Sequence, residues 1–335
     1  MKKHLIAVAV VAAFSAPAIA QNVTLSGYVE SGLENTKNSS SGTADTTAFV
    51  GGVFGSSRLV IGGSEDLGGG LKAGFRLEGA VDVTNGRLGA TTAGTQATTG
   101  QIFDRGAEIN LSGAFGTIAY GKLDHNGIEG NDLNVVGNIA LGDDSSTGVE
   151  VAGAASDANG TLRYTSPTIN GLNLIVGWTP SDNGGATLAK SAHEGISSVQ
   201  VTGSLSGVNF RVGGGRVNAS AGDTDVRGFG VSYNFGMAEA SLFYQNEDKP
   251  AATADSKNTI LSAKIPLGNG LDVRAMYETL DVAGGTTSDS TTMVLALAKT
   301  LSKRTTVYGM FRNIDLELAG ANDTKELGIY IGHAF

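Results

Sequence analysis

The C-terminal stretch Lys325–Phe335 (KELGIYIGHAF) alternates between large apolar residues and small or polar ones. Counting back from Phe335 in steps of two gives His333, Ile331, Ile329 and Leu327. The interleaved positions are small or polar apart from Tyr330, and this period of two indicates a strand with one apolar and one polar face. Because the sequence ends on an aromatic residue, we predict that this strand pairs with the first strand and closes a barrel in lipid, with Phe335 as the assembly signal.

The first twenty residues have the features of a secretory signal peptide. Lys2 and Lys3 precede a short apolar run from Leu5 to Phe14, and Ala18-Ile19-Ala20 provides a cleavage site. We therefore expect residues 1–20 to be a signal peptide and residues 21–335 to form a single transmembrane β-barrel domain.

Composition excludes several functional classes. The formal net charge is −9, which argues against nucleic acid as a partner. Cysteine is absent, so there is no disulfide framework, thiol catalysis or cysteine metal site. Beyond the leader, no apolar stretch approaches the ~20 residues that a transmembrane helix needs. Evenly spread apolar residues instead favour many short alternating strands.

Alternating segments recur along the whole chain, separated in turn by long polar connections and short turns. Short turns on one rim and long loops on the other are typical of an outer-membrane barrel. We predict an all-β fold, an antiparallel transmembrane β-barrel of 16 strands, and an even number lets the first and last strands meet. The strands are centred near residues 28, 61, 76, 108, 120, 163, 175, 200, 211, 230, 241, 262, 275, 296, 309 and 330.

Two sets of residues on the expected outer surface carry further hypotheses. Aromatic residues at strand ends suit the headgroup level of a membrane: Phe115, Tyr164, Trp178, Tyr233, Phe235, Tyr308 and Phe335. Small residues on the outward faces of the first strands either let another protein approach closely or are glycines tolerated in twisted strands: Gly27, Ser31, Gly63, Ala73 and Gly79. Both interpretations of the small residues stay open.

Stretches distributed over the chain resemble the general-diffusion porins of Gram-negative bacteria, in particular the sixteen-stranded trimeric type of β-proteobacteria. The strongest are Ser57–Glu78 (SRLVIGGSEDLGGGLKAGFRLE) and Leu301–Tyr308 (LSKRTTVY). The others are Val23–Gly32 (VTLSGYVESG), Phe103–Gly121 (FDRGAEINLSGAFGTIAYG), Tyr164–Gly171 (YTSPTING) and Ile331–Phe335 (IGHAF).

This resemblance implies a homotrimer of water-filled barrels in the outer membrane, with a long third loop folded into each lumen. That loop spans about residues 124–160, and its acidic residues would face basic side chains on the wall: Glu129, Asp132, Asp143, Asp144 and Glu150. The resemblance places wall arginines at Arg58 and Arg105. Gly62, Gly332 and Glu108 depart from the family pattern, each making the site less positive, and leave the ion preference open.

Strand parity tests which basic residues can face the lumen. Arg58, Arg76 and Arg163 fall on polar faces, so we expect them on the wall of the constriction. Arg105 and Lys122 have outward parity and reach the lumen only if a bulge or a strand end intervenes. Lys72, near a turn, is expected to be a solvated rim charge.

The sequence offers little for catalysis. Gly116–Lys122 (GTIAYGK) has the spacing of a phosphate-binding loop, but Leu123 follows instead of Ser or Thr and the stretch reads as a strand. The Asp143-Asp144 pair could hold a divalent cation, although ordinary solvated charge is the better interpretation. We expect no catalytic residues, no metal and no cofactor.

The sequence therefore predicts an outer-membrane porin for passive diffusion of small hydrophilic solutes and ions, with lipids and two further copies as partners. A substrate-selective channel of the same fold is the alternative, and a run of lumen-facing aromatic residues would favour it. An outer-membrane enzyme and a soluble β-sandwich are further alternatives. Neither the residue pattern nor the predicted signal peptide favours them.

Overall fold

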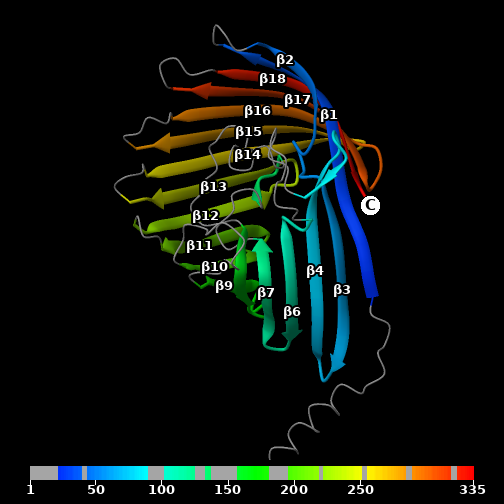
Figure 1. The fold of residues 1–335 in the computed structure, drawn as a ribbon. Helices are drawn as coiled ribbons and strands as arrows, with labels where there is room; N and C mark the ends of the chain where they lie inside the picture. The colour runs from blue at the N-terminus through cyan, green and yellow to red at the C-terminus, as the bar shows by residue number, and fades with distance from the viewer. Residues whose placement is uncertain are drawn as a thin grey trace, which may run out of the picture.

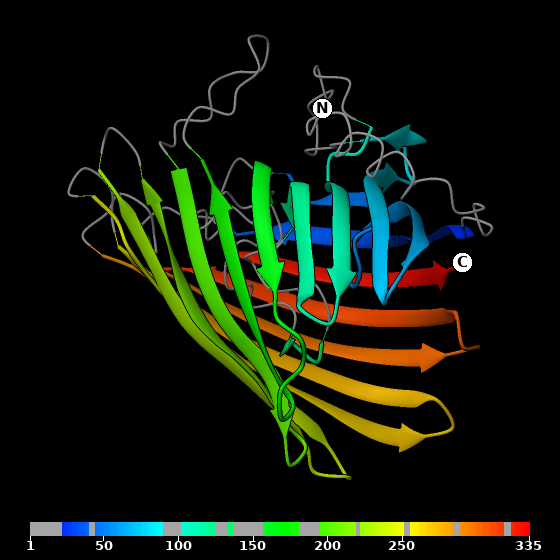
Figure 2. The same ribbon diagram turned by 90° about the horizontal axis from the view of Figure 1, so that it is seen from below.

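The structure is a computed structural model that describes residues 22–39, 44–89, 102–124, 133–136, 157–180, 195–218, 222–250, 255–283, 289–317 and 323–335. Within these ranges, sixteen long strands form one closed antiparallel barrel (Figures 1 and 2). The strands are β1 (Asn22–Asn38), β3 (Arg58–Gly68), β4 (Leu71–Asp82), β6 (Gly106–Gly113), β7 (Gly116–Asp124), β8 (Asp157–Thr165), β9 (Leu172–Thr179), β10 (Gly195–Leu205), β11 (Val208–Asn218), β12 (Thr224–Asn234), β13 (Glu239–Asp248), β14 (Ser256–Gly268), β15 (Leu271–Val282), β16 (Ser290–Thr300), β17 (Thr305–Leu316) and β18 (Thr324–Ala334). Each predicted strand centre falls in one of them. The predicted signal peptide lies outside the described residues.

The last strand has the two faces that its sequence predicts. Ile329 and Ile331 are 68% and 51% exposed on the outer face, whereas Tyr330 between them is 1% exposed on the inner face. The same alternation runs through β16, where Leu295 is exposed and Ala296 buried. A continuous apolar outer surface is what the hydrocarbon region of a bilayer requires.

The barrel closes between its first and last strands. β1 pairs with β18 from Tyr28 opposite Ala334 to Asn38 opposite Thr324. Beyond this ladder, the Phe335 amide donates to the Gly27 carbonyl at 3.0 Å, and the Gly27 amide donates to the Phe335 carbonyl at 3.1 Å. A side chain at Gly27 would collide with the Phe335 ring, so the glycine provides the space in which the terminal ring lies.

The short connections gather on one rim, as predicted. Ser206-Gly207 and Asn269-Gly270 link neighbouring strands, and all four residues have positive φ angles, between 51° and 83°. This backbone geometry is that of the two-residue hairpin turn whose twist matches the flanking strands. Such tight links fix the register of each hairpin.

The stretch of residues 35–55 reads as one of the long polar connections, but part of it is strand. β1 continues to Asn38. β2 (Thr46–Val50) pairs with the C-terminal half of β1, and β3 pairs with its N-terminal half. β2 and β3 thus flank the same side of β1 and are interrupted by Gly51–Ser57, here called the inward segment. A further short strand, β5 (Arg87–Leu88), pairs with β4 in the next long connection.

The outward small residues have explanations within the chain. Gly27 accommodates Phe335, a side chain at Gly63 would meet the Phe75 ring, and one at Gly79 would meet the Ile102 carbonyl. The Ser31 hydroxyl donates to the Val50 carbonyl at 3.1 Å. Close packing within one barrel therefore accounts for most of this set.

One aromatic residue does not lie where the sequence analysis placed it. Trp178 and Phe235 are exposed, as headgroup-level residues should be, but Tyr308 is only 9% exposed and faces the lumen. Its partners across the ladder, Ala298 and Tyr330, are inward-facing too.

No helix among the described residues is long and apolar enough to cross a membrane.

Deleting Phe335 should impair folding of the barrel, because the deletion removes two backbone hydrogen bonds and the ring over Gly27. We expect the folded fraction, measured by the heat-dependent shift of the band in an electrophoresis gel, to fall severalfold. Ile331→Ala is the control, since it trims the lipid face of the same strand without touching the closure. Equal folded yields of the deletion and the wild type would contradict this role.

Candidate functional site: the lumen wall

A buried carboxylate gathers three arginines on one side of the lumen. Glu78 on β4 has a side chain only 2% exposed. Arg105 Nε lies 2.9 Å from its Oε1, and Arg58 Nε lies 3.7 Å from the same oxygen. Arg76 binds the other carboxylate oxygen, Oε2. We call these residues the arginine cluster; its three cations and one carboxylate leave a surplus of two positive charges.

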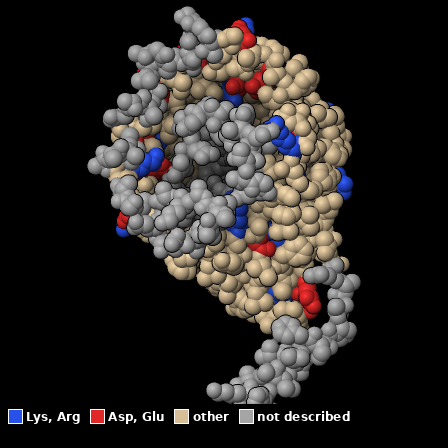
Figure 3. All heavy atoms as spheres, in the orientation of Figure 1, with Lys and Arg blue, Asp and Glu red and all other residues tan. Residues whose placement is uncertain are grey.

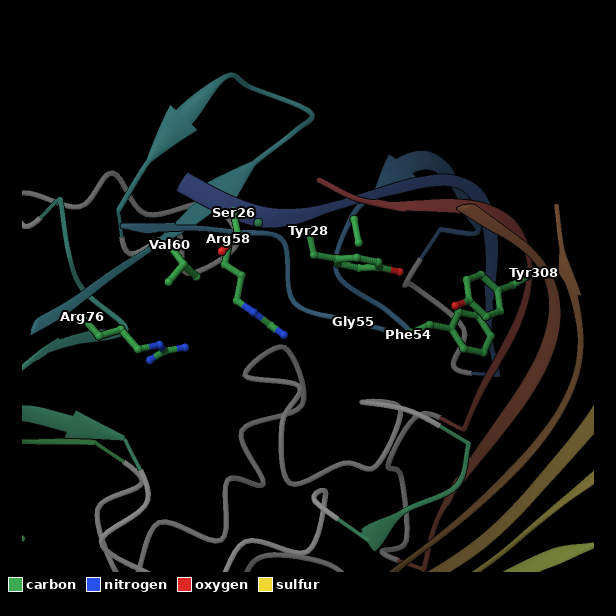
Figure 4. A pocket seen from close by; sticks show the side chains of 10 residues that line it. Ser26, Tyr28, Phe54, Gly55, Arg58, Val60, Arg76 and Tyr308 are labelled. Carbon is green, nitrogen blue, oxygen red and sulfur yellow. The ribbon is translucent and has the colours of Figure 1, made fainter. Parts of the chain in front are cut away.

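Strand geometry explains why these residues meet. Arg76 and Glu78 are two apart on β4 and share its inner face. Arg58 on β3 lies opposite Ala80, which is on that same face. The Arg58 and Arg76 side chains are 37% and 43% exposed, and both extend into the lumen (Figure 4). Both side chains therefore point inward, as strand parity predicts.

Arg105 has outward strand parity, yet its side chain reaches the lumen because the residue lies at a strand end. β6 begins only at Gly106, so Arg105 lies at a strand end, where its amide donates to the Glu78 carbonyl at 3.2 Å. Lys122 lies at a β-bulge between Gly121 and Leu123, the other device that could redirect a side chain. Its side chain is half-buried.

Arg163 on β8 forms an ion pair with Glu108 on β6, with Nη2 3.3 Å from Oε2. Both side chains are about one-fifth exposed, 22% for the arginine and 19% for the glutamate. Glu108, which departs from the family pattern by adding a negative charge, is thus balanced by a neighbouring cation. The surplus charge of the arginine cluster is not cancelled by this pair.

Part of the long third loop lies inside the barrel. The loop 3 segment, Leu133–Val136, packs on the inner wall, and Val136 is fully buried. The Val135 amide donates to Ser262 Oγ at 3.2 Å, and Arg274 Nη1 donates to the Val136 carbonyl at 3.1 Å. The prediction that this loop folds into the lumen is confirmed for these residues. The acidic candidates of the loop lie outside the described residues: Glu129, Asp132, Asp143, Asp144 and Glu150.

The inward segment is a second insertion, which sequence reasoning missed. Phe54 stacks on Tyr308 with ring centroids 4.1 Å apart, and Tyr330 meets it edge to face at 5.6 Å. The Phe54 amide donates to Glu30 Oε1 at 2.7 Å, and the Glu30 amide donates to Ser57 Oγ at 2.9 Å. The only signal in the sequence is a phenylalanine within the glycine-rich run GGVFG, in a segment that otherwise reads as a polar loop.

Both insertions pack on the same apolar part of the inner wall. Phe54 and Val136 belong to one buried cluster with side chains from β13 to β18, among them Phe243, Met276 and Val294. Many other buried residues of the inner face are polar, among them Gln200, Gln245 and Glu278. Figure 3 shows Lys, Arg, Asp and Glu side chains spread around this end of the barrel.

Two wall arginines also escaped the sequence analysis. Arg274 pairs with Asp272 at 2.6 Å and lies over the Tyr308 ring, 5.5 Å from its centroid. Arg312 pairs with Glu326 on the neighbouring strand and is buried. Strand parity assigns both to the inner face, so the same rule could have found them.

Comparison with known proteins gives one consistent result. The sequence matches the family described as Gram-negative porin over residues 7–317. It is 30% identical to outer membrane porin protein 32 of Delftia acidovorans, over 99% of this chain and 95% of that protein. It is 32% identical to the major outer membrane protein P.IB of Neisseria gonorrhoeae over 58% of this chain.

Solved structures share the fold. The anion-selective porin from Comamonas acidovorans superposes with a TM-score of 0.74 at 22% identity, covering 94% of this chain and all of that one. The trimer form of OmpT from Vibrio cholerae superposes with a TM-score of 0.63 at 14% identity, over 94% of this chain.

Replacing Glu78 by Gln should destabilise the barrel, because three guanidinium groups would lose their shared counter-charge. We expect a decrease in unfolding free energy of roughly 1–3 kcal/mol, less than for a fully buried pair because the arginines are partly exposed. Denaturant unfolding in detergent, followed by circular dichroism, measures it. Glu108→Gln removes the carboxylate that pairs with Arg163 and should cost less. A larger loss for Glu108→Gln would contradict the assignment.

Proposed function

Because the chain belongs to the Gram-negative porin family, and is thus an outer-membrane channel for passive diffusion, we propose that the arginine cluster and the loop 3 segment bound its constriction. The observation that supports this proposal is the lumen itself. A sixteen-stranded barrel is wide enough for an aqueous channel. Here the arginine cluster lies on one part of the inner wall, and the loop 3 segment packs on another. Solutes would pass between them without being bound tightly.

The surplus charge of the arginine cluster would attract anions. In a narrow passage with walls of low dielectric constant, fixed charges act more strongly than the net charge of the whole chain. The anion selectivity of the porin from Comamonas acidovorans, which has the same fold, agrees with this proposal. Lys122 and Arg163 would contribute to the wall, and the loop acids Glu129, Asp132, Asp143, Asp144 and Glu150 would set the opposing charge.

We also propose that the protein acts without catalysis, because channel formation is the activity of its family. The outer-membrane enzyme considered from the sequence has no support in family membership. In the same way we propose that residues 21–335 act as one domain after removal of residues 1–20.

A homotrimer is the proposed assembly. The support is that OmpT, a protein of the same fold, has a trimer form. The outward glycines no longer contribute to this argument, since most of them accommodate neighbours within one chain.

Arg58→Glu should shift ion selectivity toward cations, because it replaces a lumen cation by an anion and changes the local charge by two units. In planar bilayers with a salt gradient, the anion-to-cation permeability ratio from the reversal potential should fall severalfold. Lys72→Glu makes the same charge change at an exposed position near a turn and should shift the ratio much less. Equal shifts of the permeability ratio in the two variants would show that Arg58 does not lie in the constriction.

The assembly is tested by the mass of the purified complex. Analytical ultracentrifugation with matched detergent density should give the mass of three chains. Unheated electrophoresis should show the same species, which heating converts to monomers. A stable monomer that conducts in bilayers would overturn the trimer proposal and leave the channel itself unaffected.

A further inference from the structure

The inward segment is held in the lumen by one strand. The Glu30 carboxylate on β1 accepts hydrogen bonds from the Phe54 amide at 2.7 Å and from the Tyr28 hydroxyl at 2.6 Å. The Ser57 hydroxyl also donates to the Glu30 carbonyl at 3.3 Å. Glu30 is 1% exposed, so these contacts are shielded from water. Such dense anchoring indicates a built element of the wall rather than a loop end.

The inward segment creates a recess with two chemically different sides. The recess has a volume of about 550 Å³ and opens to the lumen. On one side lie the rings of Tyr28, Phe54 and Tyr308, and on the other lie Arg58 and Arg76 (Figure 4). Val60 on β3 adds apolar surface on the side of the arginines, between Arg58 and Arg76 (Figure 4).

The two sides suit different parts of one solute. A guanidinium group binds a carboxylate through paired hydrogen bonds, and an aromatic surface beside it takes an apolar body. The side chains of Arg58 and Arg76 are 37% and 43% exposed to the lumen, so an anion that passes through can reach both guanidinium groups. Chloride or acetate would use the arginines alone.

We propose that this recess is a binding subsite for small organic anions that join a carboxylate to a planar apolar body. Arg58 and Arg76 bind the carboxylate, while Tyr28, Phe54 and Val60 contact the body. The subsite retains such solutes briefly on their way through the pore. This inference rests on the proposed function, because it assigns a preferred solute class to the same constriction.

The test compares benzoate with acetate, which carry the same charge, as blockers of chloride current through the purified full-length channel in planar bilayers. Covering one face of a phenyl ring is worth about a tenfold change in affinity, so benzoate should half-block at a roughly tenfold lower concentration. Equal half-blocking concentrations would overturn the proposal.

Three variants separate the apolar side from general effects. Phe54→Ala should reduce the preference for benzoate to within about twofold. Val60→Thr keeps the shape of the wall and the hydrogen bonds of the inward segment, and should reduce the preference roughly threefold. Phe243→Ala removes an aromatic ring of the same buried cluster that does not line the recess, and should leave the preference unchanged. An unchanged preference in both Phe54→Ala and Val60→Thr, or its loss in Phe243→Ala, would place benzoate elsewhere.

The two levels of the hypothesis fail differently. If benzoate and acetate block alike while Arg58→Glu still shifts the reversal potential, the subsite is absent and the constriction stands. If Arg58→Glu shifts neither the reversal potential nor the block by either anion, the proposed constriction fails with it.

Discussion

Every other feature of this molecule depends on the pairing of the first strand with the last. In hydrocarbon no water is available to satisfy backbone amide and carbonyl groups, so a sheet that crosses it must have no free edge. The β1–β18 ladder removes that edge, and the bonds between Gly27 and Phe335 extend it to the chain terminus. A glycine is needed at position 27 because the terminal ring occupies the space of a side chain.

Closure at sixteen strands produces a wide tube, and the lumen is then shaped by segments that leave the wall. The loop 3 segment and the inward segment both bury apolar residues against β13–β18, which explains why that part of the inner wall is apolar although it faces a channel. The cations on β3, β4 and before β6 lie on another part of the inner wall. The two insertions therefore pack on an apolar part of the inner wall, and the arginine cluster occupies a different part.

The arginine cluster illustrates the cost of concentrating like charge. Three guanidinium groups in a confined space repel one another, and the buried Glu78 carboxylate offsets part of that repulsion while fixing their positions. A cluster without it would be more positive but less ordered. Placement of the carboxylate behind the arginines leaves Arg58 and Arg76 facing the passage, where a solute meets them.

The sequence by itself determined the barrel, the number of its strands and which rim carries the short turns. The reason is that alternation with a period of two and the residues of tight turns depend only on neighbouring residues in the chain. It also assigned Arg58, Arg76 and Arg163 to the inner face by parity. Only the tertiary structure decided the course of Gly51–Ser57, the inward position of Tyr308 and the meeting of Arg105 with Glu78. Those depend on where a strand is interrupted or begins, and on contacts between residues far apart in the chain, for which alternation carries no signal.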